Sequence, residues 1–369
     1  NFRVTYKLEE HINKNGKIRT DIFNNWNQSK KIYRYVNRVS FTHLDYPMKV
    51  DISIVKSSSK NERRRYIQTY NIDESNVFQN PESYEIEIEA IKDPKNNVRN
   101  FHRNKDPVFI AGEMQQVAKI VLSGLQGTNY PISLSNQRQV IQNYFRLLHE
   151  EDYKKRNEQF KPKDYAVPKD FLGPNSKALQ IENIGPINSN IIVPNITEPY
   201  SFCVTEKADG ERHLLYVASD GKIYLINTSM SVIFTGAFTN EERCFNSILD
   251  GELILHDKLG NFINTFASFD MYFYNKIDVR HRPFIKTPLK EDKYFEEGCR
   301  LPMLKEFVKI LKPKHISQQN NENKLTHCPI KIISKKFYPL FNERIIENEL
   351  EEDKEKEKNK KEQKDKKKL

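Results

Sequence analysis

Residues 206–212 read Glu206-Lys207-Ala208-Asp209-Gly210-Glu211-Arg212 and lie between two apolar runs, residues 200–205 and 214–217. The pattern predicts a strand, a short loop and a second strand, with a lysine at the end of the first strand. A lysine amine attacks phosphorus only when it is neutral, and burial or nearby cations lower the pKa of an amine. A chemical role for Lys207 therefore requires that its side chain be withdrawn from water.

The residues around Lys207 suit the binding of a nucleotide. Gly210 allows the backbone to turn tightly or to approach a ligand closely. Asp209 offers a hydrogen-bond acceptor beside the lysine, and Arg212 offers a rigid fork of donors. A charged hairpin on a solvated surface carries the same residue types, so this stretch alone leaves both interpretations open.

A second pattern lies upstream, in residues 84–90, where three glutamates alternate with apolar residues. Alternate residues of a strand share a face, so we expect Glu85, Glu87 and Glu89 on one face. The apolar residues of this stretch take the other face and are expected to pack into the core. If the glutamate face is wet, this is an ordinary half-buried strand. In an enclosed space, three like charges at this spacing require a cation, and their oxygen ligands favour Mg²⁺ or Mn²⁺.

Two acidic motifs follow the lysine stretch within apolar, strand-like sequence. Residues 248–254 read Ile-Leu-Asp-Gly-Glu-Leu-Ile and carry Glu252, while residues 266–272 read Phe-Ala-Ser-Phe-Asp-Met-Tyr and carry Phe269 and Asp270. Each acid taken singly also fits a turn at the end of a strand. The order of the three motifs, with strands between them, favours a common site.

Together these motifs resemble those of the covalent nucleotidyltransferases, which comprise mRNA capping guanylyltransferases and the ATP-dependent DNA and RNA ligases. Residues 207–212 match the nucleophile motif Lys-x-Asp-Gly-x-Arg of that family. The resemblance implies that Lys207 is the catalytic nucleophile, that GTP is the substrate and that Mg²⁺ or Mn²⁺ assists. The nucleotide-binding residues that it implies are Glu206, Asp209, Gly210, Arg212, Glu252, Phe269 and Asp270.

The upstream part resembles the tunnel-type, metal-dependent RNA triphosphatase that begins the capping enzymes of large DNA viruses. The resemblance implies that Glu85, Glu87 and Glu89 bind the metal. It also implies contacts to the RNA 5′-triphosphate from Arg38, Asp51, Lys56 and Arg65, although solvent-facing charge is the alternative for each of these four. The family's earlier Glu-x-Glu strand is not recognised, which favours a fragment that does not hydrolyse triphosphates unaided.

The expected fold class is α+β. The residue pattern predicts antiparallel strands followed by helices in residues 1–160, and the resemblance implies that these strands form a partial β tunnel. Its strands are expected near 32–41, 49–55, 65–70 and 84–91 and its helices near 111–125 and 136–155, the second helix capped by Ser135. By resemblance, residues 161–341 form the N-terminal part of an ATP-grasp-like nucleotidyltransferase domain of antiparallel sheets with helices. Residues 342–369 form a charged low-complexity tail, expected to be disordered or at most a solvated helix.

Composition narrows the class of protein further. The 369 residues include 60 lysines and arginines against 50 aspartates and glutamates, a net charge of +10. Some of the excess lies in the lysine-rich run 354–368, and the remainder is compatible with RNA or nucleotide partners. The four scattered cysteines argue against a zinc site or a disulfide scaffold and favour a reducing compartment. No apolar stretch approaches the roughly 20 residues of a membrane span.

The sequence therefore predicts part of a viral-type mRNA capping enzyme, an RNA 5′-triphosphatase followed by a guanylyltransferase that acts through a lysine–GMP intermediate. Expected partners are the RNA 5′ end, GTP and a methyltransferase domain or subunit, and the expected location is the cytoplasm, including a viral factory or virion. The chain opens at Asn1 without a methionine and two later family motifs are not recognised, so we expect a fragment. Two alternatives stay open: an ATP-dependent polynucleotide ligase and a catalytically incomplete paralogue that binds RNA ends.

Overall fold

The computed structural model describes residues 12–91, 106–155, 159, 161, 163, 165–183, 202–285, 298–318 and 327–339. The structure is mixed α/β with mostly antiparallel sheets. It divides into two compact units, Asn1–Gly127 and Thr128–Leu369. None of the helices in the described ranges has the length and apolar character needed to cross a membrane.

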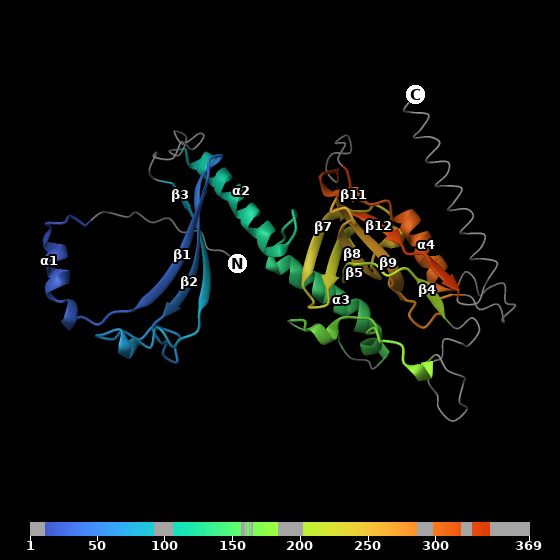
Figure 1. Ribbon diagram of the computed structural model, residues 1–369, viewed down its shortest axis with the longest axis horizontal. Coiled ribbons are helices and arrows are strands. Elements are labelled where there is room, and N and C mark those ends of the chain that lie inside the picture. Colours follow the sequence, from blue (N-terminus) through green and yellow to red (C-terminus); the bar gives the residue numbers. More distant parts are fainter. Residues whose placement is uncertain are drawn as a thin grey trace. The chain divides into compact units, whose positions relative to one another are not determined.

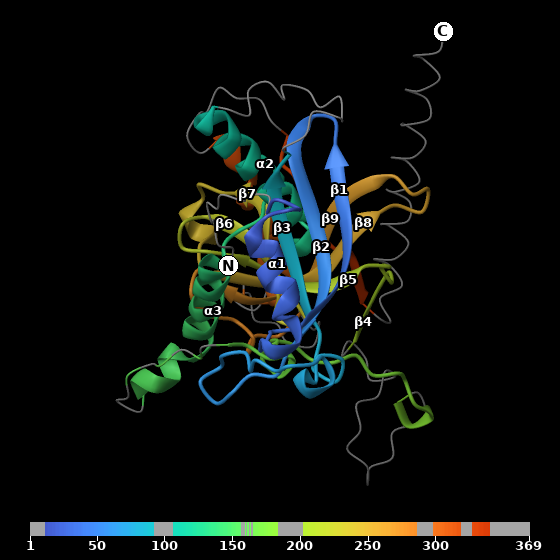
Figure 2. The ribbon, with the colours of Figure 1, turned by 90° about the vertical axis from the view of Figure 1, so that its left-hand side faces the viewer.

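The first unit contains one three-stranded antiparallel sheet in the order β1-β2-β3. Its elements are α1 (Lys17–Asn24), η1 (Trp26–Gln28), β1 (Arg34–His43), β2 (Tyr46–Ser57), η2 (Asp73–Ser75), β3 (Ser83–Ala90) and α2 (Pro107–Gln126). The strands run side by side in both views (Figures 1 and 2), and α2 packs against β2 and β3. Three described strands are fewer than a closed tunnel needs, so the tunnel stays a prediction.

The two faces of this sheet differ in an unexpected way. Register places Glu85, Glu87 and Glu89 on the face that also carries Asp51 and Ser53 of β2. Asp51 and Ser53 are fully buried in that charged face. The glutamate side chains of the charged face are 38% to 52% exposed, and the apolar side chains of residues 52, 54, 84 and 86 on the other face are exposed as well. The prediction that the apolar residues of 84–90 pack into the core is therefore wrong for Tyr84 and Ile86, because no described segment covers them.

Three further differences from the expected elements concern local structure. Residues 65–70 make only isolated bridges, Lys60 with Tyr66 and Lys31 with Thr69, instead of a strand. The second long helix begins at Leu134, and the hydroxyl of Ser133 accepts a hydrogen bond from the amide of Asn136 at 3.1 Å. Ser133 therefore caps this helix in place of Ser135. The helix α1, 8 residues long, was not expected from the sequence.

The second unit is built on an eight-stranded sheet in the described residues, in the order β10-β9-β8-β5-β6-β7-β11, with β12 paired in parallel to β9. Its strands are β4 (Cys203–Thr205), β5 (Glu211–Val217), β6 (Lys222–Asn227), β7 (Val232–Phe238), β8 (Ser247–His256), β9 (Phe262–Tyr274), β10 (Ile277–Asp278), β11 (Lys314–His315), β12 (Lys331–Ser334) and β13 (Phe337–Pro339). Its helices are α3 (Leu134–Lys155), η4 (Pro168–Asp170), η5 (Ile181–Asn183), η6 (Glu242–Cys244), α4 (Arg300–Leu311) and η8 (Ile316–Gln318).

The central strand β5 is buried on both faces, which explains its continuous apolar run. Leu214 and Tyr216 pack into a core that also contains residues of α3. Leu215 and Val217 point the other way, into a core that contains residues of α4. α4 packs against β9 and β12 (Figure 1). The sheet thus lies between two hydrophobic cores.

The boundary between the units differs from the expected one. The sequence assigned residues up to 160 to the first domain, whereas the structure places α3 in the second unit. The reason is packing, because Val140, Ile141, Tyr144 and Phe145 of α3 belong to the same core as β5. Amphipathic periodicity identifies a helix but does not identify the sheet that its apolar side covers.

Tyr144 ties α3 to the segment that precedes the lysine-bearing part of the chain. Its hydroxyl donates a hydrogen bond to the carbonyl of Asp170 at 2.8 Å and accepts one from the amide of Leu172 at 3.0 Å. Tyr144 is fully buried, and this burial raises the pKa of its hydroxyl, which therefore stays protonated. One side chain thus fixes the path of residues 170–172.

We expect Tyr144→Phe to lower the free energy of unfolding by about 1 kcal/mol, because it leaves the partly buried Leu172 amide and Asp170 carbonyl without their partner. Urea denaturation followed by circular dichroism measures this. Tyr165→Phe is the matched control, since Tyr165 is 76% exposed. Equal unfolding midpoints for the two variants would contradict the role given to Tyr144.

Candidate functional site

An ion pair between β5 and β8 forms the centre of the candidate site. Arg212 donates through Nε to Asp250 Oδ1 at 3.1 Å and through Nη2 to Asp250 Oδ2 at 2.6 Å. The hydroxyl of Tyr272 on β9 donates to the same Oδ2 at 2.5 Å. Asp250 is fully buried. Three adjacent strands therefore meet at one buried carboxylate.

The pKa values of the side chains in this cluster depend on burial and on the hydrogen bonds among them. Burial raises the pKa of Asp250, while the hydrogen bonds from Arg212 and Tyr272 act in the opposite direction. Burial and the neighbouring Asp250 carboxyl both raise the pKa of Tyr272, so its hydroxyl remains a donor. A bidentate arginine–carboxylate pair is geometrically specific, so Arg212 is held in one orientation.

The segment of residues 171–174 covers the ion pair. The carbonyl of Pro174 accepts a hydrogen bond from Arg212 Nη1 at 2.7 Å, and the ring of Phe171 lies 5.3 Å from the Arg212 guanidinium carbon. Gly173 has a φ of +129°. A Cβ at this position would lie 2.4 Å from Arg212 Nη2 and 2.7 Å from the Tyr272 hydroxyl. Glycine is therefore required for the segment to approach the cluster so closely.

Glu252 lies opposite Arg212 in the register between β5 and β8. Its Oε2 atom is buried and has no hydrogen-bond partner among the described residues. A buried carboxylate oxygen without a donor is costly, so such an atom indicates a missing partner. A ribose hydroxyl, an ammonium group or a metal ion supplies the complementary chemistry. The structure thus supports a ligand-facing role for Glu252.

Lys207 is not buried, contrary to what its proposed chemistry requires. Its side chain is 91% exposed, and its ammonium lies 3.4 Å from the carboxylate of Asp209, which is 90% exposed. Glu206 is exposed as well. Residues 206–210 join β4 to β5 without being covered by any described segment, which leaves the lysine in solvent. Gly210 makes the expected close approach, but to the chain itself: a Cβ there would lie 2.7 Å from the Leu253 carbonyl oxygen.

The next motif brings Phe269 close to the centre and turns Asp270 toward α4. The ring of Phe269 lies 6.0 Å from the Arg212 guanidinium carbon and 5.9 Å from the Lys335 ammonium. Asp270 accepts two hydrogen bonds from Arg300, at 2.8 and 3.1 Å. In this structure Phe269 is therefore part of the site, while Asp270 is held by an arginine of α4.

The chain segment 331–339 connects the sheet to the lysine-bearing strand. β12 pairs in parallel with β9, and β13 pairs antiparallel with β4. The hydroxyl of Thr205, two residues before Lys207, donates to the carbonyl of Lys336 at 2.7 Å. This segment places Lys335 beside Phe269 and holds the strand from which the lysine loop starts.

The charged face of the first unit, defined as residues 34, 38, 49, 51, 85, 87 and 89, brings together only some of the predicted residues. Arg38 bonds to Asp51 at 3.0 Å and to Glu87 at 2.7 Å. The other ion pairs of this face are Arg34 with Glu85, Lys49 with Asp51, and Lys49 with Glu89. The three glutamates are therefore each neutralised by a neighbouring cation.

Two of the predicted triphosphate-binding residues lie elsewhere. Lys56 pairs with Tyr35 in the register, which places it on the opposite face from Asp51, and its ammonium lies 3.7 Å from Glu82. Arg65 lies in the loop between β2 and β3. The structure thus joins Arg38 and Asp51 in one cluster but not Lys56 or Arg65.

The described residues contain no group of three or more His, Cys, Asp or Glu side chains that could hold a metal ion. Mg²⁺ commonly binds one or two carboxylates together with substrate phosphates, so a smaller ligand set also serves it. The orphaned oxygen of Glu252 fits such a partial set. Metal binding by Glu85, Glu87 and Glu89 stays a prediction.

Several residues of the site were not selected from the sequence. Asp250 was visible in the Asp-Gly-Glu stretch, but its pairing with Arg212 depends on strand register. Tyr272 ends the aromatic run 266–272, and nothing in that run distinguishes its buried hydroxyl from a packed ring. Arg300 lies outside every motif. Lys335 and Phe171 also lie outside the motifs.

Comparison with known proteins finds one family and one relative. Residues 195–359 match the family described as mRNA capping enzyme, catalytic domain. The chain is also similar to a protein of Acanthamoeba polyphaga mimivirus named "Probable mRNA-capping enzyme", with 28% identity over 254 residues. The alignment covers 68% of this chain and 16% of the relative, so the chain spans a small part of that protein. These matches confirm the resemblance to mRNA capping enzymes.

We expect Gly173→Ala to displace residues 171–174, because the added Cβ collides with Arg212 Nη2 and Tyr272. The hydrogen bond from Arg212 to the Pro174 carbonyl should then weaken. The free energy of unfolding should fall by more than about 2 kcal/mol, the sum of backbone strain and overpacking. Gly260→Ala is the matched control, since Gly260 also has a positive φ of +81° but no atom within 4 Å of its added Cβ. Equal losses in the two variants would show that the close approach does not matter.

The buried Asp51 makes the charged face sensitive to acid. Burial alone raises the pKa of Asp51, but hydrogen bonds from Ser40 and Lys49 and the nearby cations outweigh it, so its pKa lies below the ordinary value. A carboxylate with a lowered pKa stabilises the fold above its unfolded pKa, and this stabilisation is lost as the pH falls through its folded pKa. Stability should therefore decline below about pH 4.

Asp51→Asn tests this. We expect the variant to lose about 2 kcal/mol at neutral pH, because Arg38 and Lys49 lose a charged acceptor. We also expect a weaker decline of stability in acid than in the parent. Urea denaturation at a series of pH values measures both. Asp73→Asn is the control, since Asp73 is exposed; an unchanged acid dependence in Asp51→Asn would contradict the assignment.

Proposed function

We propose that this chain carries the nucleotide-transfer part of an mRNA guanylyltransferase, with Lys207 as its nucleophile and GTP as its substrate. The observation that carries the proposal is the buried, orphaned carboxylate oxygen of Glu252, opposite Arg212 in the strand register and within the segment that matches the capping family. The relative's printed name is in agreement. The activity of any whole protein that contains the chain is part of this proposal.

The proposed reaction has two displacements. The neutral amine of Lys207 attacks the α-phosphorus of GTP, a P–N bond forms, the α–β P–O bond breaks and pyrophosphate leaves, while the nitrogen gives up a proton. A terminal oxygen of a diphosphate-ended RNA then attacks the same phosphorus. A new P–O bond forms, the P–N bond breaks and the lysine nitrogen regains a proton. The product carries guanosine joined through three phosphates to the RNA.

The residues around the ion pair have separate tasks in this proposal. Glu252 accepts a hydrogen bond from a ribose hydroxyl through its orphaned oxygen. Arg212 is held by Asp250 and is a positioning residue. Phe269 offers a ring face to the base, between the cations of Arg212 and Lys335. A divalent metal bound through Glu252 and the phosphates would neutralise phosphate charge.

Water exclusion is the main requirement of the proposal. An amine that is 91% exposed is surrounded by water, and nucleophilic attack on a phosphate anion is favoured when that water is removed. Bound nucleotide, together with other parts of the chain, must therefore cover the 206–210 loop during the reaction. The strand β4 is held by β13 alone among the described elements, which makes this loop the most easily moved part of the site.

We further propose that the three-stranded sheet of the first unit belongs to an RNA 5′-triphosphatase. Its support is the charged face, where cations and carboxylates of three strands alternate and Asp51 is buried among them. Bound phosphate would compete with the carboxylates for Arg38 and Lys49. The RNA 5′ end is the implied partner, and a methyltransferase domain or subunit remains an expectation.

One observation favours a second candidate. The exposure of Lys207 agrees with a catalytically incomplete protein that binds RNA ends without forming an adduct. An ATP-dependent ligase shares the lysine motif but does not account for the charged face of the first unit. A test of covalent labelling separates all three.

We expect the protein to form a covalent adduct with GTP labelled at the α-phosphate, in the presence of Mg²⁺ or Mn²⁺ and detected after denaturing electrophoresis. The adduct should be lost in Lys207→Ala and in Lys207→Arg, because a guanidinium stays protonated. Lys258→Ala is the matched control, since Lys258 is an exposed lysine of the β8–β9 turn. The P–N bond should survive alkali and break in acid.

Each other outcome of the labelling experiment has a defined meaning. Label from ATP in place of GTP would support the ligase. Absence of any adduct from the full-length protein, with RNA binding retained, would support the incomplete paralogue. Labelling that survives Lys207→Ala would remove Lys207 from the mechanism.

A further inference from the structure

A second charged surface in the first unit is distinct from its charged face. We define the basic–aromatic patch as residues 12–31 and 59–75. The two segments are joined by a bridge between Lys31 and Thr69, and the hydroxyl of Tyr33, just beyond the first segment, donates a hydrogen bond to the Tyr70 carbonyl at 2.8 Å. The first segment contains five lysines and arginines and one acidic residue. The second contains four lysines and arginines and three acidic residues. The patch is therefore basic.

Aromatic rings are interleaved with these cations. Each of four exposed rings carries a cation over its face, at distances of 4.8 to 5.3 Å between the cationic atom and the ring centroid. The pairs are Arg19 with Phe23, Lys30 with Tyr70, Lys31 with Trp26, and Lys60 with Tyr66. The rings are 40% to 66% exposed. Each pair thus presents a flat π-surface and a positive charge together.

The cations of the patch differ from those of the charged face in their partners. On the charged face, Arg34, Arg38 and Lys49 are all paired with carboxylates. In the patch, none of the nine lysines and arginines forms an ion pair with a carboxylate of the described residues. Their charge is therefore available to an external anion.

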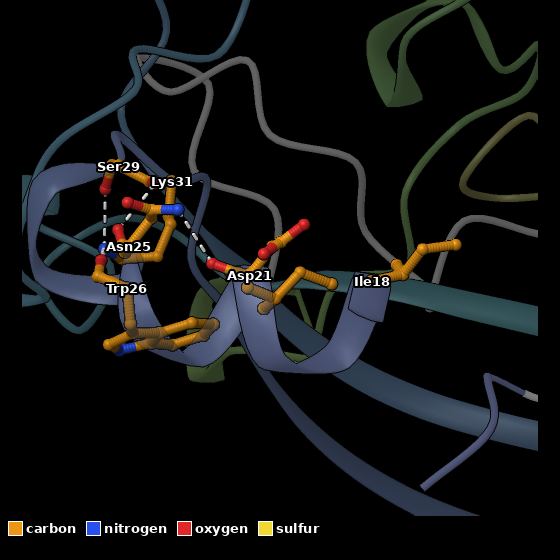
Figure 3. A pocket seen from close by; sticks show the side chains of 7 residues that line it. Ile18, Asp21, Asn25, Trp26, Ser29 and Lys31 are labelled. Atoms are coloured by element: carbon orange, nitrogen blue, oxygen red, sulfur yellow. Dashed lines mark hydrogen bonds between the residues drawn. The ribbon is translucent and has the colours of Figure 1, made fainter. Parts of the chain in front are cut away.

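Trp26 lies beside a hollow that Figure 3 shows from close by. The hollow has a volume of about 460 Å³ and is lined by residues 18, 21, 22, 25, 26, 29 and 31. The Lys31 ammonium donates hydrogen bonds to the carbonyls of Trp26 and Ser29 and lies 4.9 Å from the indole centroid. The ring is thus fixed beside a cation, and it is 52% exposed.

From these observations we infer that the basic–aromatic patch binds single-stranded RNA, with a base stacked on Trp26 and phosphates contacted by the surrounding lysines and arginines. Alternation of cations and exposed aromatic rings is the arrangement by which proteins hold single strands, because every base has a stacking face and every nucleotide a phosphate. The inference rests on the proposed function only because it takes RNA as the ligand. In this inference the patch binds nucleotides in the interior of the RNA chain, away from its 5′ end.

Other ligand classes fit the patch less well. An acidic peptide would use the cations but leave the four rings without a planar partner. Double-stranded RNA presents phosphates and ribose hydroxyls while its bases are stacked inside the duplex, so the rings would contribute nothing. Single-stranded RNA uses both features of the patch.

The experiment uses the fact that Trp26 is the single tryptophan of the chain, so tryptophan fluorescence, excited at a wavelength that tyrosine does not absorb, reports on this site alone. Oligouridine with a 5′-hydroxyl, added without GTP, cannot be capped or hydrolysed at a 5′-phosphate. We expect saturable quenching of the fluorescence, with an affinity that falls as salt is raised because phosphate contacts release counterions. A duplex of the same length should quench weakly.

Variants test the contribution of stacking, with affinity measured by the anisotropy of labelled oligouridine. Trp26→Ala should weaken binding about tenfold, and Trp26→Phe should restore most of it, because stacking requires only a ring. Phe262→Ala is the matched control, since Phe262 is an exposed aromatic residue of the second unit, 67% exposed. Its affinity should equal that of the parent.

Three results would overturn the inference: no quenching by oligouridine, equal affinity for single strand and duplex, or equal affinity in Trp26→Ala and Phe262→Ala. Guanylylation from labelled GTP is measured on the same preparation of the parent protein, without any substitution. A protein that forms the adduct but fails to bind oligouridine refutes the patch alone. A protein that binds oligouridine but forms no adduct refutes the proposed guanylyltransferase alone.

Discussion

The buried carboxylate of Asp250 is the constraint on which the second unit depends. A charge removed from water is stable only when its partners are in place, and loss of one partner leaves an uncompensated charge that costs several kcal/mol. Arg212 on β5 and Tyr272 on β9 supply those partners. The strand order β9-β8-β5 is therefore fixed by chemistry as well as by packing. The same pairing sets the register that brings Glu252 opposite Arg212.

The sequence predicted the elements of this site better than their contacts. Apolar runs on both sides of residues 206–212 gave the strand–loop–strand arrangement, and the acidic stretches at 250–252 and 269–270 lie on β8 and β9 as expected. Arg212 and Asp250 are 38 residues apart in the chain, and they meet only because β5 and β8 pair in one particular register. The periodicity of each strand does not predict this register. The position of Lys207 in solvent was missed for a related reason, because burial of a loop depends on what covers it.

In the first unit, the alternation of glutamates and apolar residues in 84–90 correctly placed the three glutamates on one face of the strand. It wrongly predicted that the apolar residues of the other face are buried. A period of two distinguishes the faces of a strand and does not say which face is covered. The structure buries Asp51 within a network of cations and leaves Tyr84 exposed. The network itself arises from Arg38 and Lys49 on neighbouring strands, which only register could have brought to the glutamates.

The pairing of β4 with β13 has a consequence for how the protein is made. The strand that leads to Lys207 ends at residue 205, yet its partner in the described structure is residues 337–339. During synthesis on the ribosome, the central strands β5 to β9 are complete before that partner has been translated. The strand that leads to Lys207 is therefore anchored late, after the sheet has had time to form. A nascent chain halted before residue 337 would carry an ordered sheet and an unanchored 206–210 loop.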